Sequence, residues 1–235
     1  MSPLSPPRFA VGEGYAFYQG PSADGVFHRH AAFQVAVAVR GEVVIVDAAG
    51  TPHRAAALIV PPMVRHRLLP TGNLRTFFVD PHCAFADRLR ERRDSGVAPA
   101  PELYGLGEHD IRRAAVHSAG ELDPRLREAM DIMAGERISM PDLAARVGLS
   151  PQHLRGLARR QLGMPLTRWR AWQRLRRAAE ALRESRPVAT AAVLGGFADQ
   201  AHLTRQMREM MGLTPATVLS LLRSASTADQ ARRAR

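Results

Sequence analysis

The stretch SMPDLAARVGLSPQHL at residues 139–154 is followed 49 positions later by a second stretch of similar pattern, which includes GGFADQAHLTR at residues 195–205. With this offset Leu154 falls on Leu203, and the glycines that follow each stretch also coincide. Self-similarity at a fixed spacing indicates a duplicated structural unit. The sequence therefore predicts two copies of one helical motif between residues 139 and 218.

Each copy carries the local signals of a helix-turn-helix. In the first copy Ser139 and Ser150 suit the N-caps of two successive helices, and Pro151 suits the first position of the second helix. Gly148 can adopt the positive φ that ends the first helix sharply. Apolar residues recur at helical spacing in both helices, which gives each of them one inward face.

The second helix of each copy has a polar outward face. This face carries Gln152, His153, Arg155 and Arg159 in the first copy, and Gln200, His202, Arg205 and Arg208 in the second. In a major groove arginine reads guanine and glutamine reads adenine through paired hydrogen bonds. A solvated helix face is the alternative for one such helix, but two at a matched offset favour contacts with double-stranded DNA.

The segment between the copies, residues 165–184, has a continuous helical pattern and would span roughly 30 Å. Successive major-groove segments on one face of B-DNA lie about 34 Å apart. A rod of this length would place the two polar helices one helical turn apart. Arg170, Arg174 and Arg177 fall on one side of it, either as a phosphate-facing stripe or as a solvated face.

The run GFADQAHLTRQMREMMGLTP at residues 196–215 resembles the signature of AraC-type bacterial transcription regulators. The resemblance implies a monomeric double helix-turn-helix domain that reads adjacent major grooves. Mapped by motif position, the base-reading places fall on Gln152, Arg155 and Gly156, and on Gln200, Ala201 and Arg205. Gly156 and Ala158 depart from the arginine and phenylalanine that are frequent in the family. Readout by the first copy is therefore weaker, or is carried by Arg155.

Residues 9–80 favour short strands, with β-rich segments at 34–39, 42–47, 56–60 and 74–79 separated by turn residues. Several strands at this spacing are typical of a barrel or sandwich. The predicted fold class is α+β: a small N-terminal β-barrel followed by an all-α double helix-turn-helix domain.

This N-terminal region resembles a small cupin domain. The resemblance lies in Gly25, His28, His30, Gln34 and Gly41 for the first cupin motif, and in residues 62–66 for the second. It implies that His28, His30 and His66 occupy metal-ligand positions, with Gln34 where the family has glutamate. Loss of an anionic ligand weakens a divalent-metal site. We therefore expect no cofactor and assign these four residues to an effector pocket, with a metal at the three histidines as the alternative.

The expected domain limits are 1–82 for the barrel, 83–120 for a helical connector, 121–223 for the DNA-binding domain and 224–235 for a flexible tail. The formal net charge is +11, and residues 121–223 hold 17 arginines against 10 acidic residues. The positive excess thus coincides with the duplicated motif, as expected for a domain that neutralises phosphates.

The single cysteine, Cys83, excludes an intramolecular disulfide framework and fits a reducing cytoplasm; a packed or surface thiol is favoured over a redox sensor. No signal peptide is apparent, and no apolar run approaches the roughly 20 residues that span a bilayer. The predicted location is cytoplasmic, without a membrane partner.

The sequence contains no phosphate-cradling glycine loop and no nucleophile elbow, so we predict a regulator and not an enzyme. The predicted function is sequence-specific transcription regulation, with double-stranded DNA as the partner. By resemblance, a small-molecule effector in the barrel or homodimer formation would change how the DNA-binding domain is presented, and an activator would also contact RNA polymerase. The alternative is a metal-binding cupin enzyme or sensor fused to a DNA-binding domain.

Overall fold

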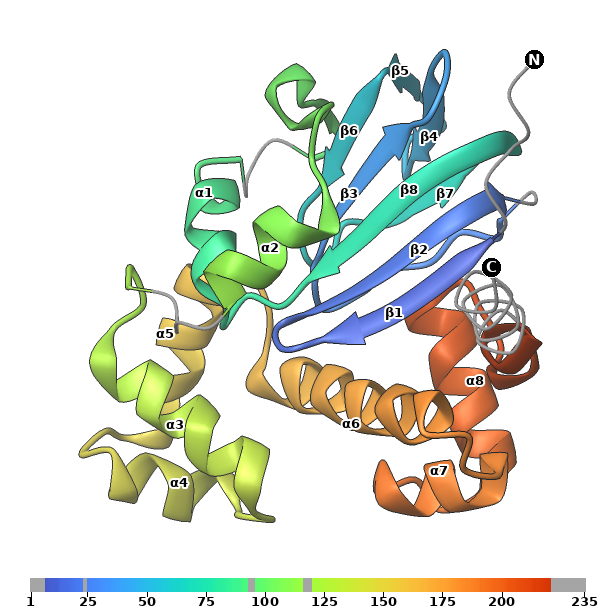
Figure 1. Ribbon diagram of the computed structural model, residues 1–235. Helices are drawn as coiled ribbons and strands as arrows, with labels where there is room; N and C mark the ends of the chain where they lie inside the picture. The colour runs from blue at the N-terminus through green and yellow to red at the C-terminus, as the bar shows by residue number, and fades with distance from the viewer. Residues whose placement is uncertain (1–6, 23–24, 93–95, 116–119, 221–235) are drawn as a thin grey trace.

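A computed structural model describes residues 7–22, 25–92, 96–115 and 120–220, with strands in the N-terminal part and helices in the C-terminal part (Figure 1). The strands are β1 (Arg8–Gly12), β2 (Tyr15–Ser22), β3 (Phe33–Ala38), β4 (Val43–Asp47), β5 (Pro52–Ala55), β6 (Ala57–Val60), β7 (His66–Leu68), β8 (Thr71–Val79) and β9 (Ala98–Pro99). They pair antiparallel in two sheets, one ordered β1-β2-β8-β3-β6-β9 and the other β5-β4-β7.

The two sheets share an apolar core, because residues alternate between the two faces of each strand. In β3, Ala36 and Ala38 pack with Ile45 of the smaller sheet, whereas Val35 and Val37 point to the opposite face. An isolated antiparallel bridge between His28 and His66 adds a further link. The predicted α+β class is confirmed, and the predicted barrel takes the form of these two packed sheets.

The face of the larger sheet that carries Val35 is covered by the segment expected to be a connector. Its elements are η1 (Ala84–Ala86), α1 (Asp87–Arg90), η2 (Pro101–Leu103) and α2 (Glu108–Ala115). Phe85, Leu89 and Ile111 from this segment pack against Phe17 and Phe77 of the sheet. These few apolar residues hold the segment on a mainly apolar sheet face, where Arg75 also donates to the carbonyl oxygens of Tyr104 and Leu106.

Cys83 lies at the start of this segment and is buried. Burial raises the pKa of its thiol to about 11, so the reactive thiolate is disfavoured near neutral pH. The expectation of a packed thiol is confirmed.

The C-terminal part consists of α3 (Pro124–Gly135), α4 (Met140–Arg146), α5 (Pro151–Leu162), α6 (Leu166–Arg183), α7 (Val188–Leu194) and α8 (Gln200–Met211). The predicted duplicated motif is present as α4–α5 and α7–α8, with α6 as the predicted rod between them (Figure 1). The expected tail, residues 224–235, lies outside the described residues.

Glycines permit the sharp turn in each motif. Gly148 and Gly196 have φ values of +65° and +75°, a conformation that residues with a Cβ rarely adopt. Gly195 is needed for a different reason: a Cβ there would lie 2.9 Å from both the Cβ of Ala178 and the carbonyl oxygen of Arg174. Only glycine therefore lets α7 pack this closely on α6.

Helix α6 lies against the sheet domain on one side and carries the helix-turn-helix units at its ends (Figure 1). Its two tryptophans, Trp169 and Trp172, belong to one apolar cluster that also contains Phe9 and Phe78 of the larger sheet. The two halves of the chain thus share a core at α6, which makes the rod a point of contact between them.

Candidate nucleic-acid interface

Helix α5 presents a polar face to solvent. The side chain of Ser150 caps its N-terminus and accepts a hydrogen bond from the backbone N–H of His153 at 3.2 Å. Its other face is buried through Leu154, Leu157, Ala158 and Leu162. The candidate DNA-contact residues Gln152, His153, Arg155 and Arg159 are all exposed. The sheet domain therefore leaves this face open.

Helix α8 repeats the arrangement with one difference. Asp199 accepts from the backbone N–H of His202 at 2.6 Å and caps the helix, and Gln200, Arg205 and Arg208 are exposed. His202 is half-buried, because its ring meets the ring of the buried Phe197 edge-on at 5.3 Å between centroids. In the second copy three of the four candidate residues thus point freely outward, and the fourth also packs.

Arg170, Arg174 and Arg177 of α6 make contacts that could not be predicted from the sequence. Their guanidinium groups donate to backbone carbonyls: Arg170 to Ile138 at 3.1 Å, Arg177 to Ala134 at 3.2 Å, and Arg174 to Gly195 at 3.3 Å and to Gly196. Arg174 also lies over the Phe197 ring at 4.5 Å. These contacts hold the three side chains in place but do not decide between a phosphate-facing stripe and a solvated face, so both stay predictions.

The bonds of Arg177 and Arg174 hold the carbonyl ends of α3 and α7 on α6, where positively charged donors are favoured by the helix dipole, and the bond of Arg170 holds the link between α3 and α4. The 18 residues of α6 span about 27 Å. Both helix-turn-helix units are therefore tied to one stiff element whose length is close to the pitch of B-DNA, roughly 34 Å.

A buried carboxylate joins the sheet domain to α6. Asp80 follows β8, is 1% exposed, and accepts from the indole Nε1 of Trp169 at 3.0 Å and from the side-chain amide of Gln173. The ring of Phe78, two residues earlier, lies 6.3 Å from that of Trp172. The end of one strand thus holds the middle of the rod through polar and apolar contacts.

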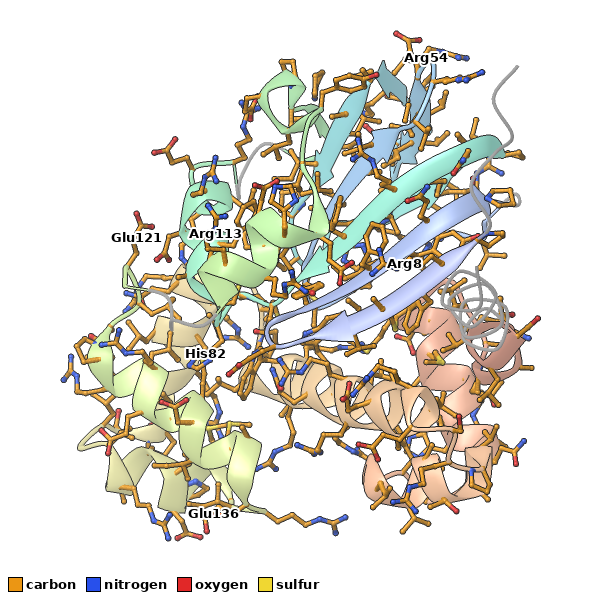
Figure 2. All side chains as sticks on the ribbon, viewed as in Figure 1. Arg8, Arg54, His82, Arg113, Glu121 and Glu136 are labelled. Carbon is orange, nitrogen blue, oxygen red and sulfur yellow. The ribbon has the colours of Figure 1, made fainter. Side chains whose placement is uncertain are left out.

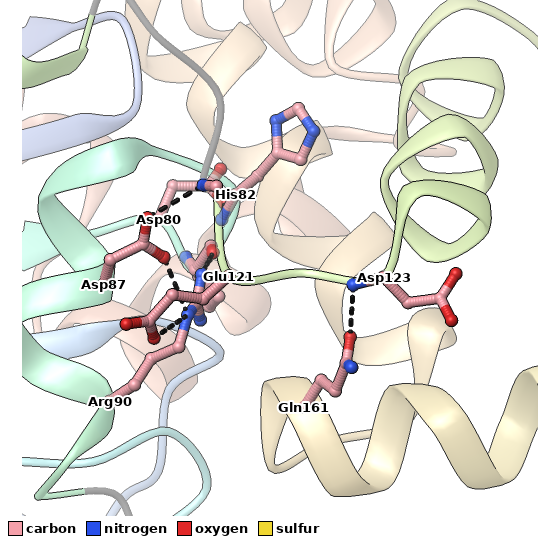
Figure 3. Close-up of polar contacts among 9 residues, drawn as sticks. Asp80, His82, Asp87, Arg90, Glu121, Asp123 and Gln161 are labelled. Carbon is pink, nitrogen blue, oxygen red and sulfur yellow. Dashed lines mark hydrogen bonds and ion pairs between the residues drawn. The ribbon is translucent and has the colours of Figure 1, made fainter.

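The chain enters the DNA-binding domain beside this carboxylate (Figure 3). Asp80 also accepts from the backbone N–H of His82 at 2.8 Å, and Arg90 pairs with Asp87 at 3.0 Å. The backbone N–H of Asp123 donates to the side chain of Gln161, in α5, at 2.8 Å. The start of the C-terminal part is therefore bonded to the first motif through Gln161.

A second candidate site lies in the sheet domain, where the structure brings together the histidines singled out in the sequence. Ring nitrogens of His28, His30 and His66 lie within 4.8 Å of one another. The Nε2 atoms of His30 and His66 are 3.0 and 2.9 Å from Oε1 of Gln34, whose Nε2 donates to Oγ1 of Thr76 at 3.0 Å. His30, Gln34 and His66 are buried.

The same three histidines have their Nδ1 atoms next to backbone carbonyls, at 2.9 Å from Val26, 2.8 Å from Ala32 and 2.9 Å from Val64. A carbonyl can only accept, so Nδ1 carries the proton and Nε2 presents a lone pair. Burial lowers the pKa of each of the three imidazoles and favours this neutral form. Three lone pairs therefore share one small region.

Two arrangements would give the three Nε2 lone pairs and the Gln34 amide suitable partners. A divalent cation held by three Nε2 atoms and Oε1 of Gln34 is one, because metal-binding histidines usually donate their other N–H to a carbonyl. The other turns the amide of Gln34 so that its nitrogen donates to the imidazoles and its oxygen accepts from Thr76. The residues present thus fit a metal with nitrogen and oxygen ligands.

Sequence reasoning missed Asp80, although the chain offers a weak signal. An acidic residue directly after an apolar strand, in a chain whose two tryptophans share one helix, indicates a buried carboxylate near an indole donor. The partners lie 89 and 93 residues apart, so no local pattern joins them.

Two helix-turn-helix units on one stiff helix, each with an exposed Gln/Arg face, define the class of helix-turn-helix DNA-binding domains. Residues 143–220 match the family model described as helix-turn-helix domain. The C-terminal part of the chain thus carries a helix-turn-helix domain, and the resemblance to AraC-type regulators stated from the sequence is confirmed for it.

Among curated proteins, the arabinose operon regulatory protein of Salmonella typhimurium is 34% identical over 113 residues, which cover 45% of this chain and 40% of that protein. The bifunctional transcriptional activator/DNA repair enzyme Ada of Escherichia coli is 30% identical over 141 residues, covering 58% of this chain and 40% of that protein. The chain thus matches less than half the length of these relatives, which are regulators, one of them also an enzyme.

Among solved structures, ToxT from Vibrio cholerae has a TM-score of 0.57 at 9% identity, covering 90% of this chain and 99% of that chain. A second ToxT structure, with unsaturated fatty acid bound, gives 0.57 at 8% identity, with coverages of 90% and 97%. This likeness shows a shared fold across both halves of the chain. None of the described helices has the length and apolar character needed to cross a membrane.

Proposed function

We propose that this protein is a sequence-specific DNA-binding transcription regulator, and not an enzyme. The observation that carries the proposal is the pair of exposed Gln/Arg faces on α5 and α8, fixed to the two ends of α6. The residues assigned to DNA are Gln152, His153, Arg155, Arg159, Gln200, His202, Arg205 and Arg208. Each recognition helix would enter one of two successive major-groove segments.

Replacing Arg205 or Gln200 by alanine is expected to change which sequences the protein binds. A bidentate contact to a base discriminates by about 1–3 kcal/mol, so each variant should lose about that much at a selected site and tolerate more bases there. The measurement is selection from a random duplex library with the full chain, followed by fluorescence anisotropy on wild-type and variant sites.

Arg208→Ala is the matched control, since it removes the same charge from the same helix one turn further on. As a phosphate contact it should weaken binding to all sequences alike and flatten the salt dependence. Variants at Arg205 and Gln200 that select the same sequences as the wild type would refute the assignment of α8 as a recognition helix.

The sheet domain is proposed as the sensory part, with His28, His30, Gln34 and His66 as the effector pocket. ToxT, which shares the fold, has been solved with a fatty acid; the pocket proposed here is imidazole-lined and suits a small polar ligand or a cation instead. Because Asp80 and Phe78 hold α6, an effector would act by shifting the population of α6 positions. The proposal also includes formation of a homodimer and, if the protein activates transcription, contact with RNA polymerase.

The domain limits proposed for these roles are 1–82, 83–120 and 121–223, with the middle segment packed on the sheet. The fold likeness to ToxT supports a sensory part joined to a DNA-binding part, and the positions of the limits come from the sequence.

A second candidate function is metal binding at His28, His30 and His66, which the closeness of their ring nitrogens and the approach of the His30 and His66 Nε2 atoms to Oε1 of Gln34 favour. After treatment with a chelator, the protein is expected to bind one Co²⁺, with visible absorption bands that report nitrogen and oxygen ligands. His66→Gln should weaken this binding by at least about tenfold. His53→Gln is the control, since His53 lies in the same domain but pairs with Asp47. Equal Co²⁺ binding by His66→Gln and the wild type would exclude the site.

A further inference from the structure

An open groove of about 950 Å³ separates the two helix-turn-helix units. It is lined on one wall by residues 133–139, between α3 and α4, and on the other by the α7–α8 turn; its basic residues are Arg137, Arg170, Arg174 and Arg177. Figure 2 shows side chains that reach into the space between α3–α4 and α7 below α6, with Glu136 labelled at the lower end of α3–α4. The groove thus lies on the side of α6 away from the sheets.

Among the described residues, no carboxylate pairs with the arginines of this groove. Its one acidic lining residue, Glu136, pairs with Arg146 instead. Burial and the neighbouring guanidinium groups of Arg137, Arg177 and Arg170 lower the pKa of Arg174, as expected for like charges held close together. Four arginines held together without a matching carboxylate raise the local affinity for an anion.

Arg137 differs from the other three, whose guanidinium groups donate to backbone carbonyls. It is exposed and makes no hydrogen bond or ion pair with the described residues. Its guanidinium nitrogen lies 3.9 Å from where a Cβ at Gly196 would be, so it reaches from the first unit to the turn of the second. Arg137 is therefore free to bind a ligand at the midpoint between the units.

The groove opens beside the second recognition helix. Ala198 and His202 line it, and they flank the Asp199 cap and Gln200 in the first turn of α8. If α5 and α8 enter successive major-groove segments, the duplex between them must pass the space that separates the two units. The backbone phosphates of that central segment would then face the four arginines.

We propose that this groove binds the sugar–phosphate backbone of the DNA segment between the two recognition helices. Arg137 makes the direct phosphate contact, and Arg170, Arg174 and Arg177 supply a fixed positive field while holding the units together. This inference rests on the proposed function. It adds a contact region that the recognition-helix residues do not include.

The test uses the full chain and a 30-base-pair duplex selected from a random library with the wild-type protein. Arg137→Ala is expected to weaken binding about tenfold at 0.1 M salt and to reduce the slope of affinity against salt by about one. Arg183→Ala is the matched control, because Arg183 also lies on α6 but pairs with Glu180 outside the groove. It should bind as the wild type does.

A second arm replaces the central phosphates of the same duplex by neutral methylphosphonates. The wild type should lose affinity on this duplex, and Arg137→Ala should lose no more than it already has. Equal affinity and equal salt slope for Arg137→Ala and the wild type would overturn the inference. Normal DNA binding by Arg137→Ala with reduced transcription in a reporter assay would also overturn it and indicate an acidic protein partner.

These outcomes are separable from a failure of the proposed function. If the wild-type protein itself selects no sequence from the library, the regulator assignment is wrong. If it selects sequences normally and the Arg137 variant does so with unchanged affinity, only the groove assignment fails.

Discussion

Replacing Asp80 by alanine is expected to lower the free energy of unfolding by about 2–6 kcal/mol, because it leaves two buried donors without an acceptor, at about 1–3 kcal/mol each. These donors are the indole N–H of Trp169 and the amide of Gln173. Among the described residues, the buried Nε1 of Trp172, one turn away, already has no hydrogen-bond partner. A second buried indole N–H without an acceptor would therefore destabilise the interface further.

The loss of stability should mainly weaken the contact between the two halves of the chain. Urea unfolding of the wild type is expected to show one transition, since the sheet domain and α6 share a core. In Asp80→Ala the two halves should unfold at separate midpoints. Both tryptophans of the chain lie in α6, so their emission should shift to longer wavelength as the interface opens.

Two further variants make the result specific. Asp131→Ala removes an exposed carboxylate that pairs with His82 at 3.3 Å between the same two halves, and it should change stability by at most about 1 kcal/mol. Asp80→Asn keeps one acceptor oxygen and should fall between wild type and Asp80→Ala. Identical unfolding curves for Asp80→Ala and Asp131→Ala would show that the buried carboxylate does not join the domains.

The helices could be predicted from the sequence because their signals are local. Ser150 and Asp199 lie at the N-caps, and glycines end the first helix of each motif, so the bounds of α4, α5, α7 and α8 follow from neighbouring residues. The role of the α6 arginines could not be predicted in this way. Their acceptors lie between 21 and 43 residues away, and periodicity places a side chain on a face without identifying its partner.

The residues of the candidate sites show the same difference between local signals and contacts with distant parts of the chain. His28 and His30 are close in the chain and His66 lies in a recognisable second motif, so their grouping was predictable. The half-burial of His202 was not, because it depends on how the ring of Phe197 turns inward at the α7–α8 turn. The Asp80 contact was missed because both of its partners lie in the other domain.

Acidification of the metal-free protein is expected to reduce its stability between pH 6.5 and pH 4. Burial and the neighbouring His28 lower the pKa of His30 to about 4, and the pKa values of His66 and His28 are lowered in the same direction. In the unfolded chain a histidine titrates near 6.5. As the pH falls below 6.5, the unfolded state gains protons that the folded state does not accept until about pH 4, so stability falls over this window.

The shift of His30 alone corresponds to about 3 kcal/mol between the ends of this window, at about 1.4 kcal/mol per pKa unit, and His66 and His28 add to it. The measurement is urea unfolding at pH 7 and pH 5 in the presence of a chelator. His30→Gln should flatten the dependence, whereas replacing the exposed His109 should leave it unchanged. A wild type equally stable at both pH values would mean that these imidazoles are not buried neutral, and the lone pairs assigned to their Nε2 atoms would then be protonated.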